Sequence, residues 1–190
     1  MTTVLVPAAL LALLLLWAVL IYNRLVAKRQ KVEEGWSGID VQLKRRTNLI
    51  PNLVETVQTY ATHEREVLDN VTALRTKAEA AQSGRAAERS VVESELSGAL
   101  LNLMAVAENY PDLKANQNYL ALQQTLEEIE DHIQMSRRYY NGAVRNLNTL
   151  IESFPSNLVA GRFGFTKATY YEVDSLKDRS LPKISGGKVT

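Results

Sequence analysis

Side chains suited to catalysis or metal binding are few in this chain, and their spacing does not match known sites. The two histidines, His63 and His132, are isolated in helical segments, and His63 opens the run HERE. A zinc-protease helix has a second histidine four residues after the first, whereas Val67 stands there. We therefore predict that both histidines are surface residues and that the chain has no metal site.

The acidic run beside His132 is the remaining candidate for a carboxylate site. It consists of Glu127, Glu128, Glu130, Asp131 and His132. A di-iron bundle needs inward Glu-x-x-His pairs, and the residue three before His132 is Ile129. We interpret the run as a solvated helix face.

Nucleophile and nucleotide motifs are also missing from the sequence. There is no cysteine, which excludes disulfides, thiolate metal sites and lipid attachment through cysteine. The sequence has no Gly-x-Ser-x-Gly elbow and no phosphate-binding glycine loop, and GRFG from Gly161 to Gly164 is typical of a turn. We predict a non-enzymatic protein without a cofactor.

The N-terminal segment has the composition of a membrane span. No charged residue occurs from Val4 to Tyr22, and this length matches the roughly 30 Å of hydrocarbon in a bilayer. We predict a transmembrane helix over residues 4–22, after a short extracytoplasmic segment, residues 1–3. Four basic residues follow the span before the first acidic residue: Arg24, Lys28, Arg29 and Lys31. These topology determinants predict an N-terminus outside the cell membrane and a cytoplasmic soluble domain, with the outer face as the alternative.

The charge balance bears on the partner. Lys and Arg number 22 and Asp and Glu number 21, so no domain-wide basic field is available to bind phosphates, and we predict no nucleic-acid partner. The run Lys44, Arg45, Arg46 is typical of a solvated helix face, with contact to anionic lipid or protein as the alternative.

Heptad spacing of apolar residues predicts an all-α fold. One series runs from Trp36 to Ala81, a second from Tyr119 to Phe154, and a shorter one from Val92 to Val106 lies between them. We predict an antiparallel helical bundle of three long helices over residues 23–174, followed by a flexible tail, residues 175–190. Pro51 lies inside the first series, where we expect a kink or a break, and a break raises the count to four helices.

The middle helix is too short to cover the membrane-proximal half of the other two. Apolar residues left open there form a candidate self-association seam: Trp36, Ile39, Leu43, Tyr140, Leu147 and Leu150. The aromatic segment from Phe154 to Tyr171 is a partial alternative cover. Because open apolar seams are usually closed by another subunit, we predict a homo-oligomer.

Polar residues in the seams predict contacts between helices. A buried charge at Arg46 or Glu64 needs a partner, and Glu130 is a candidate for Arg46 on an antiparallel helix. Four asparagines are expected to cap or cross-link helices: Asn109, Asn116, Asn141 and Asn148. Gly35 and Gly38 indicate a close helix contact or a hinge.

Three separated stretches carry a family resemblance: WSGIDVQLKRRTNLIPNLVETVQTYATHE, ENYPDLKANQNYLALQQTLEEIE and SRRYYNGAVRNLNTLIESFPSNLVA. Together they resemble the LemA family of bacterial membrane proteins over about residues 20–175. The resemblance implies a four-helix soluble bundle. It also implies a membrane-organising role, because relatives include proteins implicated in magnetosome formation. Some members resemble outward-facing lipoproteins, with a cysteine where this chain has its apolar span.

The sequence is compatible with two functions. The first is a single-pass membrane-anchored scaffold that self-associates or organises other membrane proteins. The alternative is a membrane-bound ligand-sensing or signalling bundle, in which a small molecule sits between helices. A dry, subunit-filled proximal seam favours the scaffold, and an apolar cavity there favours the sensor.

Overall fold

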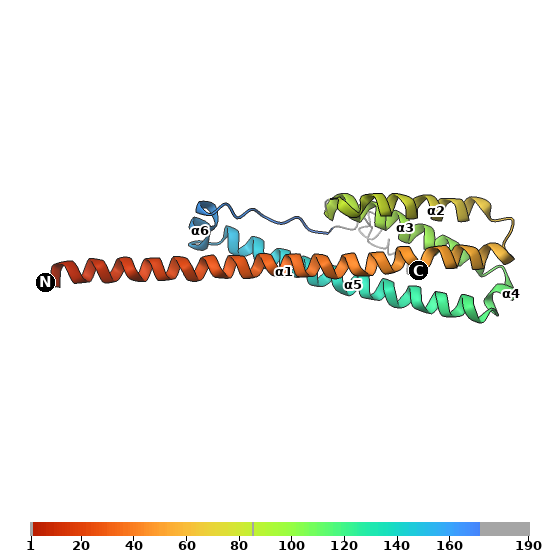
Figure 1. Cartoon of the computed structure of the whole chain (residues 1–190), viewed down its shortest axis with the longest axis horizontal. Coiled ribbons are helices and arrows are strands. Elements are labelled where there is room, and N and C mark those ends of the chain that lie inside the picture. The colour runs from red at the N-terminus through yellow and green to blue at the C-terminus, as the bar shows by residue number, and fades with distance from the viewer. Residues whose placement is uncertain (1, 85, 172–190) are drawn as a thin grey trace, which may run out of the picture.

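The computed structural model describes residues 2–84 and 86–171, and the regular elements in these ranges are all helices. They are α1 (Thr2–Tyr60), α2 (Arg65–Ala80), the short 3-10 helix η1 (Ala81–Ser83), α3 (Ala86–Ala107), α4 (Pro111–Lys114), α5 (Gln117–Glu152) and α6 (Ser156–Arg162) (Figure 1). The predicted all-α fold is confirmed. The predicted tail, residues 175–190, lies outside the described residues.

Helix α1 continues through Pro51, so of the kink or break expected there the break does not occur. Proline cannot donate to the carbonyl four residues earlier, which belongs to Thr47. In the structure this freed carbonyl accepts a hydrogen bond from Nε of Arg75, on α2, at 3.1 Å. A neighbouring helix therefore satisfies the group that Pro51 leaves unpaired, and α1 continues to Tyr60.

The first predicted helix is instead divided at residues 61–64, between α1 and α2. The heptad series folds back on itself there, so that Leu53 and Val57 of α1 share one buried cluster with Leu68 and Val71 of α2. Tyr110 donates a hydrogen bond to Glu64 in this turn at 3.0 Å. The soluble part is therefore an up-down-up-down bundle of α1, α2, α3 and α5 rather than three long helices.

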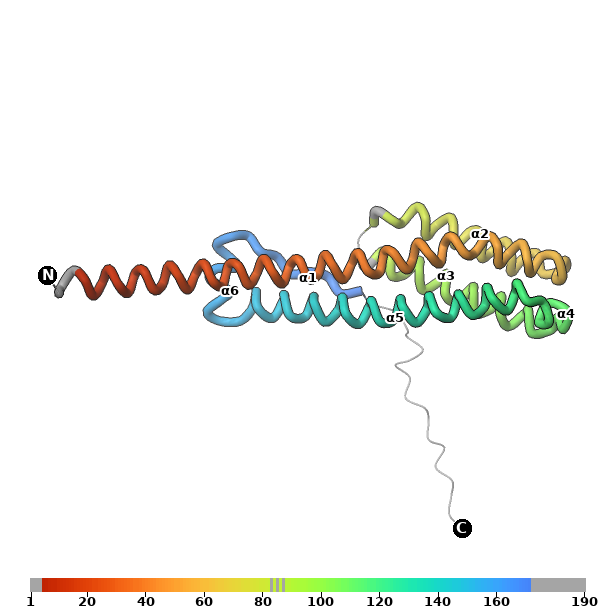
Figure 2. The backbone as a smooth tube through the Cα atoms, turned by 60° about the horizontal axis from the view of Figure 1, so that its bottom comes forward, coloured from red at the N-terminus to blue at the C-terminus, as the bar shows by residue number. Residues whose placement is uncertain are grey.

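The antiparallel pair α1 and α5 is the spine of the bundle. Helices α2 and α3 pack against each other and cover only the half of the spine farther from the N-terminus (Figures 1 and 2). The nearer half forms a second buried cluster, in which α6 and the segment after it pack against α1 and α5. We call residues 163–171 the strap.

The strap is held to α5 by two asparagine side chains. Asn148 accepts a hydrogen bond from the amide of Ala168 at 2.9 Å and donates one to the carbonyl of Ala168 at 2.9 Å. Asn141 accepts from the amide of Tyr171 at 2.9 Å and donates to its carbonyl at 3.0 Å. These two asparagines therefore tie α5 to an extended segment, whereas the sequence predicted that they cap or cross-link helices.

The spacing of these contacts fits an extended chain on a helix. Seven residues of helix α5 rise about 10.5 Å, and three residues of extended chain span about 10 Å. Because the pairs are Asn148 with Ala168 and Asn141 with Tyr171, the strap runs antiparallel to α5. Tyr140 adds a bond from its hydroxyl to the carbonyl of Thr169 at 2.8 Å.

The strap corrects the prediction of an open seam. Four of the six seam residues are buried inside this chain and the other two are partly buried: Ile39, Leu43, Tyr140 and Leu147, and Trp36 and Leu150. The ring of Tyr171 lies 6.1 Å from that of Trp36. The premise for self-association through this seam is therefore wrong, because the chain's own C-terminal segment fills the space.

Gly35 brings the two helices of the spine close together. A Cβ atom there would lie 3.0 Å from Cα of Tyr140 and 3.1 Å from Cδ1 of Tyr139. The predicted close helix contact is confirmed at this position. The turn predicted at Gly161 to Gly164 is also confirmed, since Gly164 has φ of 70° and the amide of Phe165 bonds to the carbonyl of Ala160, as in a Schellman motif.

Two described helices are long and apolar enough to cross a bilayer, within Leu5–Tyr60 and Glu88–Ala107. They differ in their surroundings. The second is α3, which packs against α2, whereas leucines along the first part of α1 are exposed on every side, among them Leu5, Leu10, Leu13 and Leu16. The N-terminal helix is thus the one suited to membrane anchoring.

We predict that Leu53→Ala lowers the free energy of unfolding by about 2–5 kcal/mol. Leu53 is fully buried in the cluster that α2 and α3 form with the spine, so its truncation leaves a cavity there. Urea unfolding of the full chain in mild detergent measures this. Glu128→Ala is the control. Glu128 is exposed on α5, so its replacement should change stability by less than about 0.5 kcal/mol. Equal losses in the two variants would contradict the assignment of the core.

Candidate functional cleft

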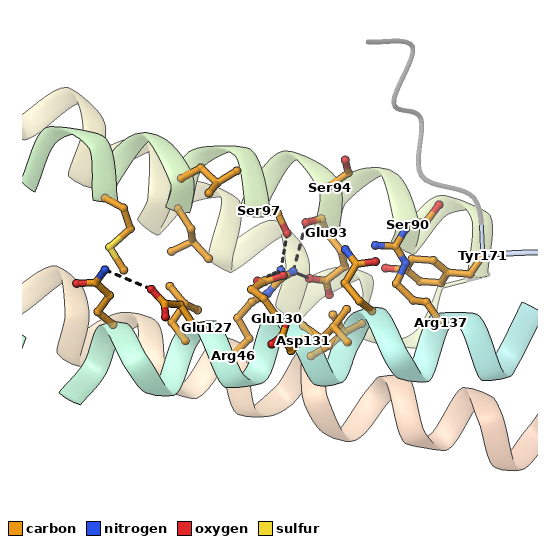
Figure 3. A pocket seen from close by; sticks show the side chains of 18 residues that line it. Arg46, Ser90, Glu93, Ser94, Ser97, Glu127, Glu130, Asp131, Arg137 and Tyr171 are labelled. Atoms are coloured by element: carbon orange, nitrogen blue, oxygen red, sulfur yellow. Dashed lines mark hydrogen bonds and ion pairs between the residues drawn. The ribbon is translucent and has the colours of Figure 1, made fainter. Parts of the chain in front are cut away.

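A cleft of about 630 Å³ opens between α3 and α5, beside the distal half of the spine (Figure 3). Its apolar part includes Leu43, Leu100, Leu126 and Ile133, and Leu101 and Met104 also line it. Its polar part comes from α3 serines, a guanidinium of α1 and carboxylates of α5. The lining on α3 extends from Ser90 to Met104, which is about 21 Å of helix.

Arg46 reaches into this cleft from α1 and is only 1% exposed. Its Nη1 donates to Ser97 Oγ and to Glu130 Oε1, each at 2.6 Å. Its Nη2 donates to the carboxylate and the carbonyl of Glu93. The pair of Arg46 with Glu130 is the one suggested by the sequence, whereas the interpretation of Arg46 as part of a solvated run is wrong.

The ion pair belongs to a longer ladder of alternating charges. Glu93 also lies 3.6 Å from Nε of Arg89, and Arg89 donates from Nη1 to Asp40 at 2.7 Å. Asp40 in turn pairs with Lys44 at 2.9 Å. The ladder runs from the exposed Lys44 through two buried arginines to the half-buried Glu130. It fixes the relative positions of α1, α3 and α5.

Burial and charge oppose each other in this ladder. Burial alone would lower the pKa of Arg46, but Glu130 and Glu93 outweigh it and raise that pKa. Burial would likewise raise the pKa of Asp40, and its contacts with Lys44 and Arg89 bring that pKa below its usual value. Nε of Arg46 and Nε of Arg89 are buried without a hydrogen-bond partner among residues 2–84 and 86–171. The pKa shifts of Arg46 and Asp40 thus both favour the charged form.

The mouth of the cleft carries unpaired negative charge. Glu127 and Asp131 line it, are exposed, and form no ion pair within the described part of the chain. Glu127 accepts only a hydrogen bond from Gln123, at 3.3 Å. Four carboxylates and two guanidiniums line the cleft, so its net charge is negative. The solvated face predicted for the acidic run holds for Glu127 and Asp131 but not for Glu130.

The end of the cleft nearer the N-terminal half of α1 is aromatic and basic. The guanidinium of Arg137 lies 5.0 Å from the ring centroid of Tyr171, the last residue of the strap. Burial lowers the pKa of Arg137, and burial together with the charge of Glu93 raises the pKa of Tyr171 to about 12. Among the described residues Arg137 forms no ion pair, although the charge of Glu130 acts on it, so its guanidinium remains available to a bound group.

The arrangement is suited to binding. No group of three or more His, Cys, Asp or Glu side chains in the described ranges could hold a metal ion. His63 and His132 are exposed, as predicted. What the cleft offers an occupant is an apolar wall, serine hydroxyls, two carboxylates at the mouth and one arginine.

The other predicted residues lie outside the cleft. The topology determinants are exposed on α1: Arg24, Lys28, Arg29 and Lys31. Asn116 caps α5 by accepting from the amides of Asn118 and Tyr119 and also bonds to Tyr60. Asn109 lies in the turn after α3, where its amide bonds to the carbonyl of Val106.

Sequence reasoning missed Arg89 and Glu93. Tyr171 was expected in the aromatic segment that partly covers the seam, but not as a residue of the cleft. Arg89 and Glu93 are four residues apart, and Glu93 precedes Ser97 and Leu100 by four and seven residues, so one helix face carries all of them. This spacing is a signal, but it is equally typical of an exposed ion pair. Their burial depends on contact with α1, which the sequence does not show.

Comparison with known proteins gives a consistent group of relatives. The profile of the LemA family matches residues 35–185. Magnetosome protein MamQ 2 of Paramagnetospirillum magneticum is 28% identical over 175 residues, covering 80% of this chain and 64% of the relative. Protein LemA of Metamycoplasma hominis is 24% identical over 155 residues, covering 82% of this chain and 70% of the relative. The chain thus spans just under two thirds of the length of the MamQ relative.

We predict that Arg46→Met destabilises the bundle by about 3–5 kcal/mol, because it leaves Glu93 buried with half of its ion pairing removed. Lys44→Met is the matched control, since Lys44 belongs to the same ladder but is exposed, and its loss should cost at most about 1 kcal/mol. Urea unfolding of both variants measures the difference. Similar values for the two would show that burial of the ladder does not matter.

Proposed function

Because the chain belongs to the LemA family, we propose that it is a single-pass membrane-anchored scaffold, and that its α3/α5 cleft holds a basic, partly apolar segment of a partner membrane protein. The proposal keeps the organising role expected from the sequence. It abandons self-association through the proximal seam, since the strap fills that seam.

The anchor is supported by the surface of α1. Large apolar side chains between Leu5 and Leu20 are exposed on all faces of the helix, and water would disfavour each of them. A bilayer is the natural cover for such a helix. The basic residues that follow the span support a cytoplasmic position for the bundle.

The observation that carries the proposal is the unpaired negative charge at the mouth of an apolar cleft. Glu127 and Asp131 lie on the rim, above a wall that includes Leu100 and Leu126. Lysine or arginine side chains of an occupant would pair with the rim while its apolar side chains contact the wall. A length of about 21 Å accommodates roughly 14 residues of helix or six of extended chain.

The continuity of α1 links the cleft to the membrane. Leu43 and Arg46, which line the cleft, lie on the same uninterrupted helix as the anchor. The charge ladder fixes α3 and α5 to this helix. A partner in the cleft would thus be held at a set height above the bilayer, which is what a scaffold for membrane proteins requires.

The relatives support a membrane setting. Three of the similar chains are named magnetosome proteins. For this chain we infer from these names only a function at a membrane.

A small-molecule sensor is the second candidate, and the size of the cleft favours it. A volume of about 630 Å³ falls within the range of about 300–1,000 Å³ typical of ligand sites. Arg137 would pair with a carboxylate or phosphate of the ligand. The carboxylates of Glu127 and Asp131 at the mouth of the cleft form no ion pair in the described part of the chain, and this favours a longer, basic occupant over a small molecule.

The test is site-specific photo-crosslinking in living cells. With p-benzoylphenylalanine in place of Leu101, which lines the cleft and is exposed, we expect crosslinks to a partner segment in which lysine or arginine alternates with apolar residues. Leu120, an exposed leucine outside the cleft, is the control position. Mass spectrometry identifies the crosslinked peptides.

Charge reversal decides the outcome. Glu127→Lys with Asp131→Lys should lower the crosslink yield about tenfold, because each rim ion pair contributes up to ~1 kcal/mol. Glu128→Lys, one residue away and outside the cleft, should leave the yield unchanged. Three outcomes would contradict the proposal: a yield that does not change with the rim charges, crosslinks to residues 172–190 of the same chain, or no protein crosslink at all. The last outcome would favour the sensor.

A further inference from the structure

The corner of the molecule formed by the end of α5 and by α6 exposes large apolar side chains. Phe154 is 80% exposed, Leu158 62% and Phe163 59%. They lie in the turn after α5, in α6 and at its C-terminal end. Exposed leucines are common singly, but three large apolar side chains within ten residues of a polar domain indicate a surface that contacts something apolar.

This corner lies beside the end of the membrane anchor. In both views the turn between α5 and α6 is the part of the bundle nearest the N-terminal end of α1 (Figures 1 and 2). The ring of Phe163 lies 4.9 Å from that of Tyr22, the last residue of the predicted span. Val159 and Ala160 of α6 share a buried cluster with Ile21 and Leu25 of α1.

The overlap extends into the span itself. Trp17 and Ala18, within the apolar segment, are partly buried against the same cluster. Helix α6 therefore packs in a cluster that includes the last turns of the predicted span and the first turns after it. If residues 4–22 cross the bilayer, α6 must lie at the level of its headgroups.

Helix α6 has the two faces that such a position requires. Ser156, Val159 and Ala160, spaced three and four residues apart, are buried on the protein side. Leu158 is exposed on the other side, with Phe154 and Phe163 flanking the helix. Aromatic side chains are enriched at the membrane–water interface, and Trp17, Tyr22 and Phe163 gather there in this chain.

We propose that Phe154, Leu158 and Phe163 insert into the interfacial region of the bilayer, so that the bundle contacts the membrane at a second point beside its transmembrane helix. The occupant of this surface is lipid. The inference rests on the membrane anchoring in the proposed function. Two points of contact restrict the tilt of the bundle, whereas one helix alone leaves the tilt free.

The test uses the absence of cysteine in the chain. Single variants of the full-length protein, Leu158→Cys and Phe154→Cys, carry a nitroxide spin label in vesicles of phosphatidylcholine and phosphatidylglycerol at three to one. Both sites are exposed, so neither label disturbs the core. Collision rates with oxygen and with a water-soluble nickel chelate report the depth of each label.

We expect both labels to collide more with oxygen than with the nickel chelate, at a depth of about 5–10 Å. Leu120→Cys, an exposed leucine at the far end of α5, is the matched control and should collide mainly with the nickel chelate. Leu10→Cys, in the anchor, reports whether the span is in the bilayer.

The outcomes separate the two proposals. Corner labels in water with Leu10 in the bilayer would overturn the second membrane contact and leave the anchor intact. A Leu10 label in water would overturn the anchor, and the second contact with it. Corner labels that match Leu10 in preferring oxygen, while Leu120 prefers the nickel chelate, support the proposal.

Discussion

The structure depends on covering the pair α1 and α5 along its whole length. Two helices alone leave one apolar side of their seam in water, and here the two halves of the seam are covered differently. Helices α2 and α3 cover the distal half. The strap covers the proximal half, where the side-chain amides of Asn141 and Asn148 take the place of a neighbouring strand. Because the chain closes its own seam, the surfaces left for partners lie elsewhere.

The positions of those surfaces follow from the way in which the two halves of the seam are covered. Since α3 packs chiefly on α2, and α5 chiefly on α1, a cleft remains between α3 and α5. The charge ladder through Arg46 and Glu93 crosses this cleft. Its charged groups therefore line the cleft together with the apolar side chains. At the other end, α6 supports the strap and in doing so exposes Phe154 and Leu158 next to the anchor. One surface suits a basic segment, and the other suits lipid.

Much of the fold could be predicted from local pattern. Heptad spacing indicates the helices, and the pair of Arg46 with Glu130 follows from charged residues on otherwise apolar faces. The same pattern marks Asn141 and Asn148 as contact residues, but not the extended segment that they bind. Heptads do not tell whether a series continues or folds back, so the turn at residues 61–64 was missed. Nor does the sequence show that Arg75 satisfies the carbonyl freed by Pro51. The cleft depends on which helices do not touch, and this is a property of the assembled bundle.

The central claim is that the proximal seam is closed within one chain. Hydrogen–deuterium exchange at the amides of Ala168 and Tyr171, in the full-length protein in phospholipid nanodiscs, tests it most directly, because these amides bond only to asparagine side chains in the described part of the chain. The account predicts exchange slowed by at least about tenfold from the unstructured rate, at every protein concentration. Exchange at the unstructured rate, or protection that appears only as concentration rises, would contradict closure within the chain.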